Sequence, residues 1–119
     1  MENKYKEIFK IQAINLANDL ILVFPNDFFI QKIKEDLVIY LSDENFVIKL
    51  NEYFTPELES SIKNRDLEDF LGFNQYLLPI SKENIAKIKF QKYWHNLSPK
   101  NKDKLWSYFE LLLKLYNNM

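Results

Sequence analysis

The side chains best suited to chemistry form a lysine-rich region between residues 82 and 104, in which aromatic residues alternate with lysines. Lysine ammonium groups attract phosphates, and aromatic rings offer faces on which nucleobases stack. The region therefore predicts a partner-binding surface, with nucleic acid as one candidate partner. Its candidate residues are Tyr93, Trp94, Lys100, Lys102 and Lys104. Solvated lysines are the simpler interpretation, because the one arginine, Arg65, lies far from this region and base-edge recognition favours arginine.

Two tryptophans, Trp94 and Trp106, flank a turn predicted at residues 97–99. If the helices on either side of the turn fold back on each other, both indoles lie near the same end of the bundle. Two interpretations follow. Tryptophan is enriched in the hot spots of protein interfaces. It also packs well in protein cores, and the apolar sequence around both residues favours core packing.

Patterns typical of catalysis or metal binding are not found in the sequence. Asp66, Glu68 and Asp69 lack the spacing of a calcium-binding loop, and a helix start explains three acids better. His95 is the single histidine, there is no cysteine, and no phosphate-binding or dinucleotide motif occurs. The sequence predicts no catalytic residue, no metal site and no cofactor. It predicts a protein that is not an enzyme.

Composition and charge predict a small helical protein with two oppositely charged regions. Of its 119 residues, 47% are apolar and 16% aromatic, which suffices for a core, and a single glycine argues against tight β-hairpins. Residues 35–69 hold ten acidic and three basic residues, whereas residues 81–119 hold eight basic and three acidic ones. Such regions suit pairing within the fold, between copies or with partners. We find no secretion signal and no charge-free run long enough to span a bilayer.

The last twenty residues predict a helix that is largely surrounded by its neighbours. Ser98 and Pro99 supply an N-cap and a proline at the first helical position. Beyond them, a narrow polar stripe runs along an otherwise apolar helix, the reverse of an ordinary surface helix. The stripe consists of Asp103, Ser107, Glu110, Lys114 and Asn117, and Glu110 and Lys114 have the spacing of an ion pair. The core residues expected in this helix are Trp106, Phe109, Leu112, Leu113 and Tyr116.

Apolar residues at helical spacing predict two further long helices in the first half of the chain. The first covers residues 5–24, includes Leu20 and Phe24 in the core, and ends at Pro25. Asn26 or Asp27 then caps a second helix, whose core side includes Leu37. Val38, Ile39 and Tyr40 are expected to widen that side, and a strand at residues 37–41 stays open as an alternative.

Capping residues predict several shorter helices in the middle of the chain. Ser42 is expected to cap a third helix, and Thr55 with Pro56 starts a fourth. A short helix over residues 66–71 is expected to end at Gly72, and another capped helix to begin at Ser81.

Two passages of the chain have a recognisable pattern. The first is LANDLILVFPND, from Leu16 to Asp27, and the second is YWHNLSPKNKDKLWSYFELLLKLY, from Tyr93 to Tyr116. Both resemble segments of small helical proteins encoded by nucleocytoplasmic large DNA viruses. In the second passage, the positions that carry the resemblance are Asn101, Leu105, Trp106, Tyr108 and Phe109. The order of parts is similar over most of the chain, and the middle is only loosely similar. The resemblance implies a viral origin, with a location in the host cytoplasm or the virion, and it supplies no catalytic residue.

Together these observations predict an all-α, single-domain bundle of five to seven helices, spanning residues 1–119, around a buried C-terminal helix. The expected function is that of a protein-interaction or assembly protein, which associates with a protein partner or with itself. The alternative is nucleic-acid binding through residues 82–104. No insertion into a membrane is expected.

Overall fold

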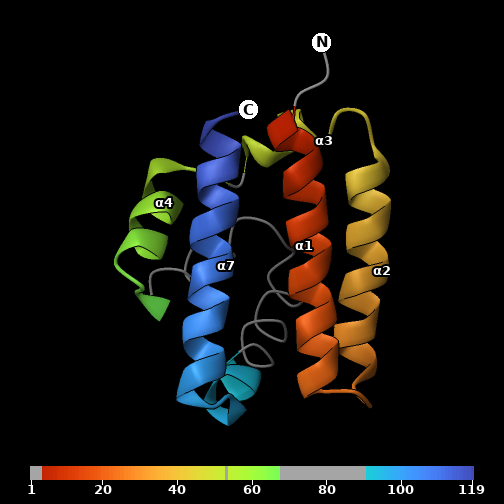
Figure 1. Ribbon diagram of the computed structural model, residues 1–119, viewed down its shortest axis with the longest axis vertical. Helices are drawn as coiled ribbons and strands as arrows, with labels where there is room; N and C mark the ends of the chain where they lie inside the picture. The colour runs from red at the N-terminus through yellow and green to blue at the C-terminus, as the bar shows by residue number, and fades with distance from the viewer. Residues whose placement is uncertain (1–3, 53, 68–90) are drawn as a thin grey trace. The chain divides into compact units, whose positions relative to one another are not determined.

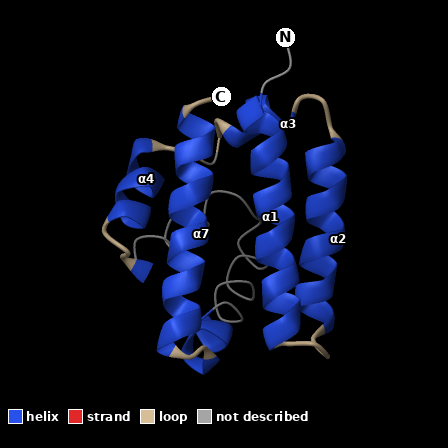
Figure 2. Cartoon of the chain, viewed as in Figure 1, coloured by secondary structure: helices blue, strands red, loops and turns tan. Residues whose placement is uncertain are grey.

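The computed structural model describes residues 4–52, 54–67 and 91–119, and within these ranges it contains helices and no strand (Figures 1 and 2). The predicted all-α fold class is confirmed. The strand considered at residues 37–41 is helical instead. Among the described residues, no helix has both the length and the apolar character needed to cross a membrane.

Contacts between residues group the chain into two compact units. Unit 1 comprises Met1–Asn51 and Leu111–Met119, and unit 2 comprises Glu52–Glu110. The last helix contributes residues to both units. The prediction of a single domain over residues 1–119 stays a prediction.

Unit 1 is built on a hairpin of two antiparallel helices, α1 (Lys4–Val23) and α2 (Phe28–Ser42) (Figure 1). Phe9, Ala13 and Ala17, four residues apart, form the buried side of α1. Helix α1 ends just before Pro25, as predicted, because proline cannot continue the hydrogen-bond ladder. The Asp27 carboxylate then caps α2 by accepting a hydrogen bond from the Ile30 amide at 3.1 Å.

The short helix α3 (Phe46–Leu50) places the most deeply buried side chain of the described core in unit 1. Phe46 is 0% exposed, and its ring centroid lies 6.2 Å from that of Phe9. The ammonium groups of Lys6 and Lys10 each lie 5.4 Å from the Phe46 centroid, within the range of a cation–π interaction. Phe46 therefore connects α3 to the N-terminal half of α1.

The predicted N-cap of this third helix is wrong. Ser42 is the last residue of α2, and its hydroxyl donates to the Val38 carbonyl at 2.7 Å. The Asp43 carboxylate instead accepts the Asn45 amide at 2.8 Å and pairs with Lys49 at 2.6 Å, so the helix starts only at Phe46. These contacts lower the pKa of Asp43 below its ordinary value, and the hydrogen bond with Lys49 has the largest effect.

The end of the last helix, α7 (Pro99–Asn117), completes unit 1. Leu112, Leu113 and Leu115 are buried there, and the Tyr116 hydroxyl donates to the Asn51 side-chain oxygen. Tyr116 itself is half-buried. The predicted core residues Leu20, Phe24 and Leu37 are half-buried as well.

Unit 2 contains α4 (Pro56–Lys63), a helical stretch over residues 91–96 and the first part of α7. Thr55 caps α4 as predicted, accepting the Leu58 amide at 3.2 Å, and Pro56 occupies the first turn. Ser61 and Ile62 form its buried side. The expectations for Gly72 and Ser81, and most of the helix expected at residues 66–71, lie outside the described residues.

Replacing Phe46 with alanine should lower the free energy of unfolding by about 3–5 kcal/mol, because it removes a fully buried ring. The matched control is Ile48→Ala in the same helix, where the side chain is 66% exposed and the loss should stay below about 0.5 kcal/mol. Urea unfolding followed by circular dichroism measures both. Equal losses in the two variants would contradict the assignment of Phe46 to the core.

Candidate functional site

The residues predicted to bind a partner lie around the turn that leads into α7. The Ser98 hydroxyl accepts the Asn101 amide at 3.1 Å, so α7 begins at Pro99 with the predicted cap. Before the turn, the Leu97 amide donates to the Trp94 carbonyl at 3.1 Å, and Leu97 is buried. The turn is thus held by its backbone and by one apolar side chain.

Trp94 and Trp106 pack against each other across this turn. Their ring centroids lie 5.4 Å apart in an edge-to-face arrangement, and Trp106 makes a similar contact with Phe109 at 5.9 Å. Trp94 is 8% exposed and Trp106 5% exposed, while Phe109 is half-buried. Both indoles belong to the interior, and Trp94 does not present a ring face on which a nucleobase could stack.

The predicted lysines differ in their surroundings. The Lys102 ammonium lies 5.9 Å from the Trp94 ring centroid, and this side chain is half-buried. Lys100 and Lys104 are exposed, and Tyr93 is half-buried. The predicted set therefore divides into Trp94 and Lys102, which pack on each other, and Lys100 and Lys104 at the surface.

Arg65 occupies an unusual backbone position at the end of α4. The Arg65 amide donates to the Ile62 carbonyl at 3.1 Å, and the Asp66 amide donates to the Ser61 carbonyl at 2.9 Å. This pair of bonds is the Schellman motif, which requires a left-handed residue and usually has glycine there. Arg65 adopts this conformation, with φ of 50°, despite its side chain.

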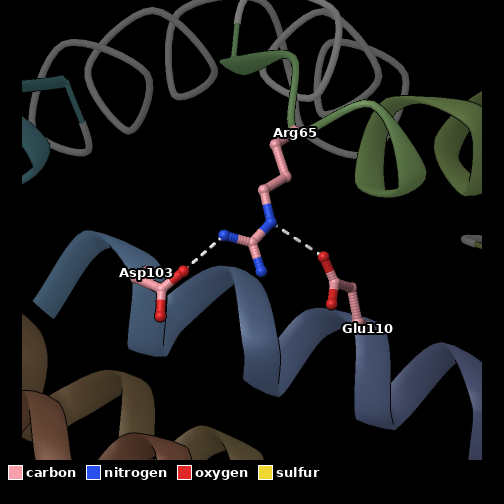
Figure 3. A network of polar contacts seen from close by, with 3 residues as sticks. All are labelled: Arg65, Asp103 and Glu110. Atoms are coloured by element: carbon pink, nitrogen blue, oxygen red, sulfur yellow. Dashed lines mark hydrogen bonds and ion pairs between the residues drawn. The ribbon is translucent and has the colours of Figure 1, made fainter. Parts of the chain in front are cut away.

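The Arg65 side chain reaches from this position to two carboxylates on α7 (Figure 3). Its Nη1 lies 2.5 Å from Asp103 Oδ1, and its Nε lies 2.9 Å from Glu110 Oε1. Both contacts raise the pKa of Arg65, and the hydrogen bond with Glu110 has the largest effect, so the guanidinium stays charged. The expectation that Arg65 lies far from the lysine-rich region is wrong. The predicted Glu110–Lys114 pair is not found among the described residues, where Glu110 pairs with Arg65.

This ion-pair network shapes the charge at the start of α7. Asp103 is the one acidic residue between positions 91 and 109, and Arg65 pairs with it. Lys100 and Lys104, on either side of Asp103 in the sequence, are exposed. The start of α7 therefore carries more basic than acidic residues, and its one acid pairs with Arg65.

Side-chain clusters that could hold a metal ion are not found in the described ranges. No three histidine, aspartate or glutamate side chains come together there to hold a metal ion. Asp66 and His95 are exposed, and Glu68 and Asp69 lie outside the described residues.

The sequence analysis missed the apolar side chains on the outside of the α1–α2 hairpin. Phe28 is 84% exposed, Leu22 77% and Ile39 71%. Val38 and Ile39 were expected on the core side of α2, but both are exposed, because Ile39 lies about 200° around the helix from the buried Leu41. Phe28 and Ile39 are eleven residues apart, about three turns, so a helical projection places them on one face.

Two substitutions at Arg65 separate its backbone role from its ion pairs. Arg65→Gly and Arg65→Ala both lose the contacts with Asp103 and Glu110. Alanine at this position still has an unfavourable positive φ, whereas glycine adopts that φ without a steric cost. The glycine variant should therefore melt at the higher temperature. At Lys63, the last residue of α4, the order should reverse, because that residue is helical and glycine is a poorer helix former than alanine. Calorimetry checks both pairs, and the same order at both positions would contradict the left-handed assignment.

Comparison of the chain with models of protein families, with curated proteins and with solved structures finds no match. The resemblance to viral helical proteins stays a prediction.

Proposed function

We propose that this chain is a non-enzymatic protein-interaction or assembly protein that binds through the outside of its α1–α2 hairpin. The observation that carries the proposal is that four large apolar side chains on these two helices are more than half exposed. They are Ile11 at 57%, Leu22 at 77%, Phe28 at 84% and Ile39 at 71%.

Folding does not explain why these positions are apolar. The buried sides of the two helices are formed by other residues, among them Phe9, Ile30 and Leu41. Burying a phenylalanine removes about 150–250 Å² from water, at roughly 25 cal/mol per Å². Phe28 and Ile39 do not realise that gain within the described fold, whereas a partner that covers them would. Single exposed apolar residues are common, but four on two packed helices favour an interface.

The viral origin belongs to the same proposal. It rests on the two sequence passages alone, Leu16–Asp27 and Tyr93–Tyr116. The first passage includes Leu22 and ends at the residue before Phe28, so it overlaps the proposed binding surface. A place in the host cytoplasm or the virion follows from that origin.

The proposal predicts that Phe28→Ser combined with Ile39→Ser abolishes capture of the partner from expressing cells. Both side chains are exposed, so the variant should fold as the wild type does. Capture on a tagged chain, followed by quantitative mass spectrometry, compares it with the wild type. The matched control is Glu52→Ser with Glu57→Ser, two exposed polar positions. An identical set of proteins captured by the wild type and by the apolar variant would contradict the proposal.

A second candidate function is binding of nucleic acid through its phosphates. The exposure of Lys100 and Lys104 at the start of α7 favours it, because Asp103, the one acidic residue between positions 91 and 109, pairs with Arg65. Base stacking on Trp94 is not part of this candidate, since that indole is buried.

Binding of this kind should weaken steeply with salt. Reversal of charge in Lys100→Glu with Lys104→Glu should reduce the slope of log K against log salt by roughly 1.4–1.8, about 0.7–0.9 for each lost phosphate contact. Fluorescence anisotropy with single- and double-stranded probes measures this. Lys63→Glu on α4 is the control. Absence of binding by the wild type at low salt would exclude this second function.

A further inference from the structure

We infer that the partner of the α1–α2 hairpin is a second copy of this chain, and that two α2 helices pack antiparallel about a twofold axis. The axis passes between Ile33 and Lys34, the midpoint of the exposed side of α2. This inference rests on the proposed function, because it names the partner of the same surface.

The exposed side of α2 carries a regular stripe of four residues. Phe28, Lys32, Glu35 and Ile39 follow one another at intervals of four, three and four. All four are exposed, Phe28 by 84%, Ile39 by 71% and the Lys32 side chain by 70%. The 4-3-4 spacing is that of the contact positions in a pair of packed helices. The stripe lies opposite the buried Ile30 and Leu41, so it is not used within the hairpin.

The stripe is symmetric about its midpoint, with an apolar residue at each end and two residues of opposite charge at the centre. Phe28 and Ile39 are equally far from the midpoint between Ile33 and Lys34, and so are Lys32 and Glu35. In an antiparallel pair with its twofold axis at this point, Phe28 meets the partner's Ile39. Likewise, Lys32 meets the partner's Glu35. Each contact occurs twice, as an isologous interface requires.

Charge complementarity selects this partner and this orientation. Two copies bring two Lys32–Glu35 pairs together at the centre of the stripe, with an apolar contact at each end. A parallel arrangement would place lysine against lysine and glutamate against glutamate, which is repulsive. Asp36 lies one turn further along the same helix, with its Oδ1 3.4 Å from Lys32 Nζ, so in the dimer the partner's Glu35 shares this ammonium with Asp36. An unrelated apolar partner would not account for the central pair of opposite charges.

Charge reversal tests the inference in purified protein by sedimentation velocity over a range of protein concentrations at low salt. Lys32→Glu alone places glutamate opposite glutamate, and Glu35→Lys alone places lysine opposite lysine. Each should weaken dimerisation about tenfold or more, the factor that corresponds to 1.4 kcal/mol. An equimolar mixture of the two single variants restores both opposite-charge contacts. It should therefore form a heterodimer at close to wild-type affinity, and so should the double variant with itself.

Phe28→Ser should weaken dimerisation about 30-fold or more, as expected for an aromatic anchor that is lost at both ends of the interface. Ile48→Ser on α3, where the side chain is 66% exposed outside the stripe, is the matched control and should leave dimerisation unchanged. Circular dichroism confirms that each variant is folded.

Two results would overturn the inference. One is a wild-type chain that sediments as a monomer at every concentration. The other is a wild-type dimer whose single charge variants fail to associate when mixed. The proposed function is tested separately from this inference. If the chain is monomeric but captures another protein in a manner that depends on Phe28 and Ile39, the interaction role stands and only the second copy is excluded.

Discussion

A helix can bury only part of its circumference against its neighbours, so apolar residues outside that part stay exposed unless a partner covers them. In α2 the limit is visible directly, since Ile30 and Leu41 fill the inner side while Phe28 and Ile39 lie in water on the outer side. Hydrophobic burial therefore accounts for the fold but not for the whole pattern. The exposed apolar side chains on the outer side are the basis of the binding role that we propose for the hairpin.

Signals that act over a few residues predicted the helix boundaries well. Pro25, Asp27, Thr55 and Ser98 each mark an end or a cap where the structure has one, because a cap bonds to a backbone amide only three residues away. Ser42 failed for a reason that is equally local. The carboxylate of Asp43 next to it forms a turn with Asn45 and an ion pair with Lys49, and this delays the helix. Neighbouring side chains such as these compete for the same backbone amides, and the sequence alone does not show which of them forms the hydrogen bond.

The candidate site depended on contacts that the sequence could not supply. Arg65 meets Asp103 and Glu110 across 38 and 45 positions, and it does so from a left-handed conformation that a reader of the sequence assigns to glycine. The sequence predicted a polar stripe on α7, and the fold adds that both acids of this stripe, Asp103 and Glu110, pair with Arg65. The outer side of α2 needed no long-range contact, only a helical projection of the residues opposite the core.

The division of unit 1 into two stretches of sequence affects the order in which the protein can be completed during translation. Its first stretch ends at Asn51 and its second begins at Leu111, so all of unit 2 leaves the ribosome before unit 1 receives its last helical turns. The contact between Tyr116 and Asn51 closes a loop of 65 positions. Until then unit 1 lacks its buried residues Leu112, Leu113 and Leu115. The N-terminal part of the chain is synthesised first but is the last to be finished.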